Sequence, residues 1–211
     1  ADGASIKPCL ISHPDHMHHT VPLGPAFFVN AGRMVSRLTW KAAGKKTVVW
    51  LRPCEIKAFV ELIKLSQASR DEVIIVGMDC PAALSRQDYD RFTEQGETTA
   101  LDPEEWVRNR YPDPGKTIAG FTPARACQVC DAPWPVNADV SVLLFGSDLD
   151  GAINLQADTP KGESFLSGLQ LDEGQEPDRR KSIVKNLGAE NQESFQAMDA
   201  QIQDQTGTME K

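Results

Sequence analysis

The stretch that decides the fold is residues 47–77, TVVWLRPCEIKAFVELIKLSQASRDEVIIVG. Its two ends, Thr47–Leu51 and Val73–Val76, are unbroken β-branched and aromatic or aliphatic runs, which is typical of buried strands. Between them, Glu55–Gln67 carries apolar residues at helical spacing with charged residues on the other side. This strand–helix–strand order predicts two parallel strands joined by a crossover helix.

Further elements are predicted on both sides of this unit. Upstream, Asn30 is a good N-cap for a helix that runs to Trp40. Downstream, Asp102 and Pro103 are typical of a helix start, as N-cap and first helical position. Val140–Phe145 is a third apolar strand, and Ala152–Ala157 is expected to return beside it as a hairpin strand.

The composition becomes polar after Asp158, with two further helices expected. These cover Asp178–Leu187 and Glu190–Gln203, with Gly188 as the stop between them. We therefore predict an α/β fold: a small, mostly parallel sheet with flanking helices, an irregular cysteine-bearing loop region and a polar helical C-terminal tail. Residues 1–158 would form the α/β domain, and residues 159–211 a helical extension or partner-docking tail.

The composition of the chain excludes several functional classes. The 211 residues carry 30 acidic and 22 basic side chains, a net charge of -8, whereas nucleic-acid binding requires a basic face. No apolar run approaches the ~20 residues of a membrane span. Ala1–Lys7 has neither the basic start nor the apolar core of a signal peptide, so we expect a cytoplasmic protein without a membrane span.

Four of the five cysteines form a pattern that is typical of a metal centre. Cys54 and Cys80 each follow a predicted parallel strand, so both should lie at the same carboxyl edge of the sheet, where open α/β sheets place their ligands. Cys127 and Cys130 have the Cys-x-x-Cys spacing that chelates zinc or an iron–sulfur cluster. Four thiolates suit either metal, so the ligand types alone leave both open.

Positive charge accompanies two of these cysteines. Arg52 and Arg125 each stand two residues before a predicted ligand, where a guanidinium would stabilise thiolates and raise the potential of a cluster. Cys9 lies outside the pattern and is expected to be a buried or loop thiol.

Three segments of the chain resemble one family. Arg52–Ala58 with Val76–Cys80, the upstream Asn30–Arg33 and the downstream Arg125–Cys130 are similar to segments of the beta-subunit family of deazaflavin-coenzyme hydrogenases and formate dehydrogenases. The resemblance extends from about Pro22 to Gly146.

The resemblance implies an oxidoreductase subunit, an iron–sulfur flavoprotein. It implies one [4Fe–4S] cluster at the four patterned cysteines and a flavin, usually FAD, approached by Asn30 and Arg33. Its partners would be subunits of a hydrogenase, formate dehydrogenase or heterodisulfide reductase complex and a soluble two-electron carrier such as a deazaflavin coenzyme. The alternative is a non-catalytic structural or interaction module with a four-cysteine zinc site.

Overall fold

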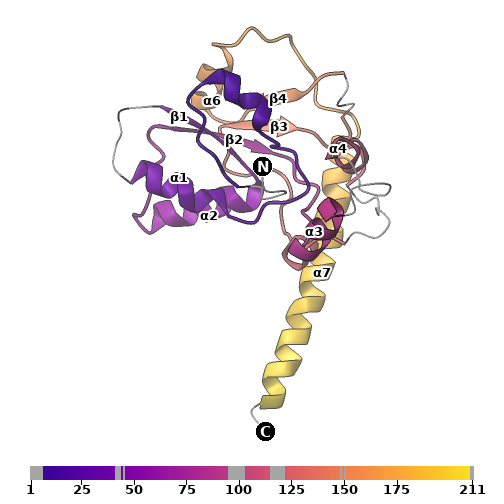
Figure 1. Cartoon of the computed structure of the whole chain (residues 1–211). Coiled ribbons are helices and arrows are strands. Elements are labelled where there is room, and N and C mark those ends of the chain that lie inside the picture. Colours follow the sequence, from indigo (N-terminus) through magenta and orange to yellow (C-terminus); the bar gives the residue numbers. More distant parts are fainter. Residues whose placement is uncertain are drawn as a thin grey trace.

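A four-stranded mixed sheet lies at the centre of the chain. The computed structural model describes residues 7–40, 44, 46–94, 103–114, 122–147, 149 and 151–209. Its strands are β1 (Thr47–Leu51), β2 (Val73–Met78), β3 (Val140–Leu143) and β4 (Asn154–Ala157), in the spatial order β1-β2-β3-β4 (Figure 1). β1, β2 and β3 are parallel, and β4 pairs with β3 in the antiparallel sense. The predicted fold class, the strand–helix–strand unit and the hairpin return are therefore confirmed.

Helices flank this sheet and connect its strands. They are η1 (Pro14–His19), α1 (Ala31–Thr39), α2 (Pro53–Lys64), α3 (Arg86–Glu94), α4 (Pro103–Arg110), α5 (Arg125–Gln128), α6 (Pro160–Leu166) and α7 (Arg180–Met209). Asn30 caps α1 as predicted, because its Oδ1 accepts a hydrogen bond from Gly32 N at 2.9 Å. The predicted N-cap Asp102 of α4 lies outside the described residues.

One face of the sheet is covered by α1 and α2 (Figure 1). Val49 and Leu51 of β1 and Ile75 of β2 pack there against Ile56 and Phe59 of α2, and all five side chains are buried. Alternate residues of a strand point to opposite faces, which is why every second residue of β1 joins this core. The predicted apolar stripe of α2 is thus the part of the helix that holds the first two strands together.

The opposite face is covered by α6 and the beginning of α7. Val76 and Met78 of β2 and Val140 and Val142 of β3 form this second core. Phe165 and Leu166 of α6, with Ile183, Val184 and Leu187 of α7, pack against it. The chain after residue 158 therefore supplies part of the core beside β3, and the domain boundary at this point stays a prediction.

The largest difference from the predicted elements is α7. Two helices separated by Gly188 were expected, but the structure has one helix of 30 residues that contains Gly188. Glycine costs a helix interior only about 1 kcal/mol relative to alanine. Here it also fits a close approach, because a Cβ at position 188 would lie 3.3 Å from the Trp134 ring.

Two smaller differences from the predicted elements concern the positions of Cys54 and Cys80 relative to α2 and β2. α2 begins at Pro53 and not at Glu55, so Cys54 lies in the first turn of the helix. β2 extends to Met78, two residues beyond the predicted end, so Cys80 follows the strand almost directly. The irregular region around Cys127 contains one short helix, α5.

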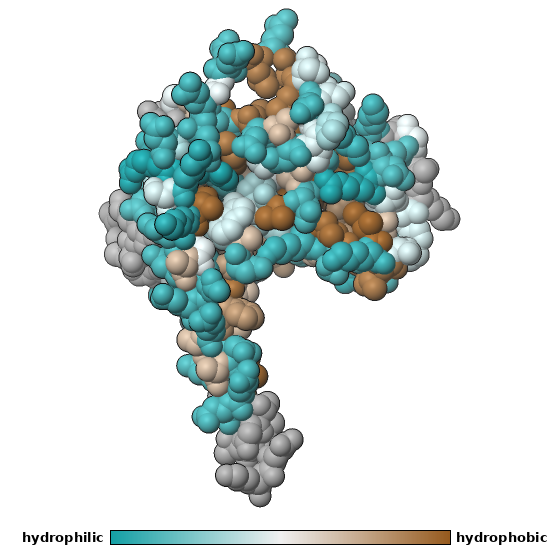
Figure 2. All heavy atoms as spheres, turned by 180° about the vertical axis from the view of Figure 1, so that it is seen from behind, coloured by the Kyte–Doolittle hydropathy of each residue, from teal (hydrophilic) through white to brown (hydrophobic). Residues whose placement is uncertain are grey.

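The distal half of α7 extends away from the rest of the molecule (Figure 1). Figure 2 shows apolar and polar residues mixed along it, and Phe195 and Ile202 are each about half exposed, at 49% and 50%. Among the described residues, no helix is long and apolar enough to cross a membrane.

The contact between α6 and the sheet predicts a stability effect. A Cβ at Gly162 would lie 1.9 Å from the backbone oxygen of Asp139, so Gly162→Ala must push α6 away from β3. We expect it to lower the free energy of unfolding by about 1–3 kcal/mol, the usual cost of overpacking. Urea denaturation followed by circular dichroism measures this.

Gly168→Ala is the matched control for that substitution. The closest atom to a Cβ at this position is Phe165 O at 3.4 Å, an ordinary contact. Its free energy of unfolding should change by no more than about 0.5 kcal/mol. Equal effects of the two substitutions would contradict the packing argument.

Candidate metal centre

A single cavity brings together the four cysteines that the sequence singled out. It has a volume of about 310 Å³, and Cys54, Cys80, Cys127 and Cys130 all line it. We call it the cysteine cavity. Its volume is at the lower end of the ~300–1,000 Å³ of ligand sites, which suits a compact group.

The sheet places the first two cysteines. Leu51 of β1 pairs with Gly77 of β2, so the chain leaves both strands at the same edge. Cys54 then lies in the first turn of α2, and Cys80 is buried, with its backbone N–H bonded to Pro133 O at 2.8 Å. The prediction that parallel strands deliver both cysteines to one edge agrees with this arrangement.

The Cys-x-x-Cys pair is fastened to the same region by backbone contacts. Ala124 N donates to Ala83 O at 2.7 Å, and Leu84 forms an isolated bridge with Pro123. α5 then turns Cys127 toward the cavity, and Cys130 N donates to Cys127 O at 3.4 Å. The loop after Cys80 is therefore what holds the pair opposite the sheet edge.

The thiols are close enough to influence one another's ionisation. Burial, and after it negative charge on Cys80, Glu55 and Cys127, raises the pKa of Cys54 to about 12. Burial and the Cys80 sulfur also raise the pKa of Cys127 and of Cys130. Negative charge on Cys80 thus raises the pKa of each of the other three thiols.

Backbone donors are already directed at two of the sulfurs. A hydrogen bond from the Ala83 backbone lowers the pKa of Cys127, and one from the Ala132 backbone lowers that of Cys130, although burial outweighs both. Such N–H···S bonds favour the thiolate and are among the features that set the potential of iron–sulfur centres. The donor set therefore fits a thiolate-bound metal group.

Two buried arginines supply positive charge beside the cavity. Arg52 is 5% exposed, donates from Nη2 to Gly24 O at 2.6 Å and lies over the Phe27 ring. Burial disfavours its charge, but Cys80 and its other anionic neighbours outweigh that and raise the pKa of Arg52. Arg110 is 7% exposed, lines the cavity and donates from Nη2 to Pro81 O at 2.6 Å.

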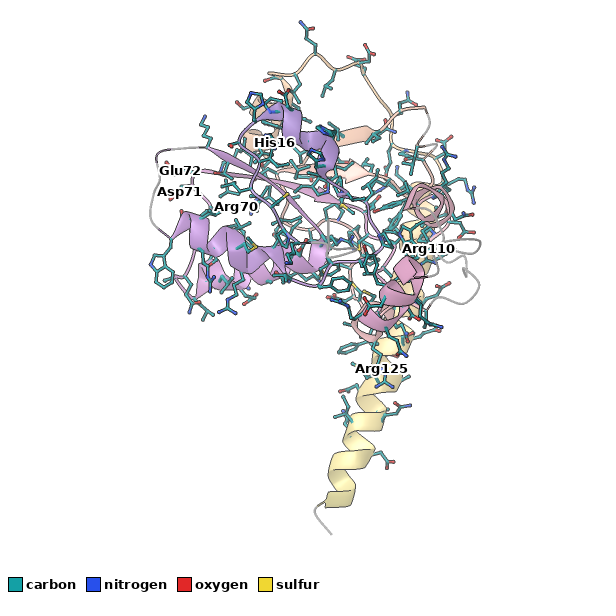
Figure 3. All side chains as sticks on the ribbon, viewed as in Figure 1. His16, Arg70, Asp71, Glu72, Arg110 and Arg125 are labelled. Carbon is teal, nitrogen blue, oxygen red and sulfur yellow. The ribbon has the colours of Figure 1, made fainter. Side chains whose placement is uncertain are left out.

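The structure places the other predicted cofactor residues differently. Arg125 is on the surface in α5, whereas Arg110 is in the body of the molecule on α4 (Figure 3). Asn30 uses its side-chain oxygen to cap α1, and Arg33 is exposed on that helix. Neither lines the cysteine cavity. Cys9 is exposed and also lies outside the cavity lining.

Sequence reasoning missed Trp106 and Arg110, which both line the cavity from α4. Their spacing of four residues places them on one face of that helix, which was a readable signal. α7 closes the cavity on another side with Leu187, Glu190 and Asn191. Among the described residues, no three histidine, cysteine or acidic side chains are placed to hold a single metal ion.

The raised pKa of Cys54 predicts slow alkylation in the metal-free chain. At pH 8 a thiol with a pKa of about 12 is almost entirely protonated, whereas a free cysteine of pKa ~8.5 is about one-quarter thiolate. Since the thiolate is the nucleophile, Cys54 should react with iodoacetamide at least a hundredfold more slowly than a free cysteine peptide.

Peptide mass spectrometry at a series of pH values measures this rate. The pH series separates a raised pKa from hindered access, because hindered access would slow the reaction equally at every pH. The rate should climb steadily as the pH rises toward the pKa. Alkylation of Cys54 at pH 8 as fast as that of the free peptide would contradict a raised pKa.

Comparison of the sequence with known proteins identifies the family to which the chain is similar. The family model for the C terminus of the coenzyme F420 hydrogenase/dehydrogenase beta subunit matches residues 44–176. The chain is also 26% identical over 152 residues to the F420-dependent formate dehydrogenase 1 subunit beta of Methanococcus maripaludis. That match covers 60% of this chain and 38% of the relative, so the chain spans well under half of the relative's length.

Proposed function

Because the chain belongs to the family of coenzyme F420 hydrogenase and dehydrogenase beta subunits, we propose that it is an electron-transfer subunit of an oxidoreductase complex. The observation that carries this proposal is the cysteine cavity, which is lined by four cysteines from three segments of the chain. The cavity would hold one [4Fe–4S] cluster, which supplies one-electron transfer when it is bound. The four thiols would be its ligands.

The surroundings of the cavity support an anionic occupant. Two buried guanidiniums contribute positive charge: Arg110 lines the cavity, and Arg52 interacts with Cys80 and Cys54 without lining it. The backbone N–H groups of Ala83 and Ala132 donate to the sulfurs of the Cys-x-x-Cys pair. Together these residues would stabilise thiolates that burial alone would keep protonated.

A flavin, FAD, belongs to the same proposal. Asn30 and Arg33 at the start of α1 are its candidate contacts. The first turn of α1 is tied to the cluster region, because Glu55 of α2 accepts hydrogen bonds from Ala31 N at 2.8 Å and from Arg52 N at 2.9 Å. A flavin held beside α1 would thus be linked to the cysteine cavity through Glu55.

The proposed partners follow from the same role. The relative's name describes a subunit of an F420-dependent formate dehydrogenase. This chain would pass electrons between the other subunits of a hydrogenase, formate dehydrogenase or heterodisulfide reductase type of complex and a soluble two-electron carrier such as a deazaflavin coenzyme.

Metal analysis of the anaerobically purified chain tests the proposal. We expect roughly four iron and four sulfide per chain and an electron paramagnetic resonance signal after reduction. One zinc per chain with no iron would overturn it and would favour the structural zinc module. Added FAD should bind to the chain and lose affinity in the Arg33→Ala variant, as measured by flavin fluorescence.

A further inference from the structure

α4 presents two polar side chains to the cysteine cavity from one face. Trp106 and Arg110 are one helical turn apart, and both are nearly inaccessible to solvent, at 2% and 7%. Both line the cavity together with the four cysteines. Arg110 also lies over the Trp106 ring, with its Cζ 5.5 Å from the ring centroid, so the two side chains form one unit.

The Trp106 indole has a donor that the described residues leave unused. Its Nε1 is shielded from solvent and has no hydrogen-bond partner in this part of the chain. The ring itself is fixed by packing with Ala26, Leu84 and Tyr89. A buried donor without an acceptor costs about 1–3 kcal/mol, so such a group calls for an explanation.

Arg110 places a positive charge close to the backbone that follows Cys80. Its Nη2 donates to the carbonyl of Pro81, the residue that follows Cys80. Its charge interacts first with Asp113 and then with Cys80. Burial makes a guanidinium costly, and an anionic group in the cavity would offset that cost.

We propose that α4 sets the reduction potential of the cluster, with the Trp106 indole N–H donating to a cluster or ligand sulfur and Arg110 supplying a buried positive charge. This inference rests on the proposed function. A cluster held here would gain one negative charge when a partner subunit or the soluble carrier reduces it by one electron. Positive charge and N–H···S bonds both favour that more negative state, so both raise the potential.

A potentiometric titration of the anaerobically purified 211-residue chain, read by electron paramagnetic resonance, tests this inference. Trp106→Phe keeps the aromatic ring and removes the donor, and Arg110→Gln removes the charge. Both should shift the midpoint to a more negative value. For Arg110→Gln we expect an about tenfold loss in the equilibrium constant for reduction, which is about 59 mV for one electron.

Arg108→Gln is the matched control, because it removes the same charge from the same helix at an exposed position. Its midpoint should stay close to that of the unaltered chain. Arg110→Lys keeps the charge, so its midpoint should lie much closer to that of the unaltered chain than the midpoint of Arg110→Gln does.

The outcomes separate the inference from the proposed function. Full cluster content with unchanged midpoints in Trp106→Phe and Arg110→Gln would overturn the role of α4 and leave the proposed function standing. An unaltered chain without iron would overturn the proposed function itself. If Arg110→Gln loses its cluster, the midpoint of Trp106→Phe tests the inference. A more negative midpoint in that variant supports the inference, and an unchanged midpoint overturns it.

Discussion

A Cys80→Ser variant is expected to lose nearly all of the iron that the unaltered chain retains on anaerobic purification. Cys80 is buried, at 8% exposure, and lines the cavity together with the other three cysteines. A serine hydroxyl ionises far less readily than a thiol and is a poor ligand for iron in these centres. The remaining three thiols cannot complete a four-thiolate set.

Iron and sulfide analysis of the purified variant measures this effect. Cys9→Ser is the control, since Cys9 is exposed and outside the cavity lining. It should keep the full iron and sulfide content. Circular dichroism confirms that both variants are folded, and a folded Cys80→Ser chain with undiminished iron would rule out Cys80 as a ligand.

The part of this centre that could be predicted from sequence is the part that local patterns determine. Thr47–Leu51 and Val73–Val76 are apolar enough to be strands wherever they are placed, and a helix between them leaves parallel pairing as the common solution. Once the strands are parallel, cysteines that follow them share an edge. The sequence alone therefore predicted that Cys54 and Cys80 lie at the same edge of the sheet.

The surroundings of the cavity could not be predicted in the same way. Arg125 is next to Cys127 in sequence, yet α5 leaves it on the surface, whereas Arg110 reaches Pro81 from 29 residues away. The prediction of Arg125 as a cofactor residue was based on its nearness to Cys127 in the sequence. The path of the chain after Cys80, however, determines which guanidinium is buried. The four-residue spacing of Trp106 and Arg110 predicts that they share a helix face, but which face lies against the cavity depends on tertiary packing.

The end of a helix could also not be predicted from local sequence signals alone. Gly188 is a strong stop signal in isolation. In the structure its missing side chain serves a contact with Trp134, a residue 54 positions earlier in the chain. Tertiary packing can override the propensity of one glycine, because that propensity is worth only about 1 kcal/mol.

The buried ion pair between Asp79 and Arg180 joins the start of α7 to the residue before Cys80. Asp79 is fully buried, and Arg180 donates to it from Nε at 2.8 Å and from Nη2 at 2.7 Å. The Asp79 carboxylate also accepts hydrogen bonds from the backbone N–H groups of Leu144 and Phe145. This one carboxylate thus connects β2, the end of β3 and α7.

Arg180→Met is therefore expected to lower the free energy of unfolding by about 3–5 kcal/mol, the usual cost of removing one partner of a buried pair. The Asp79 charge would remain inside the protein, with the backbone N–H groups of Leu144 and Phe145 as its donors among the described residues. Urea denaturation followed by circular dichroism measures the loss. Since α7 lines the cysteine cavity with Leu187, Glu190 and Asn191, the same variant should also release iron faster to a chelator.

Two further variants separate this effect from a general loss of charge. Lys64→Met removes a cation from an exposed pair with Glu61, in which both side chains are 64% exposed, and should cost about 0.5 kcal/mol or less. Adding Asp79→Asn to Arg180→Met removes the unpaired buried charge and should recover part of the lost stability. A loss of under about 1 kcal/mol for Arg180→Met would mean that the pair does not hold α7 against the sheet.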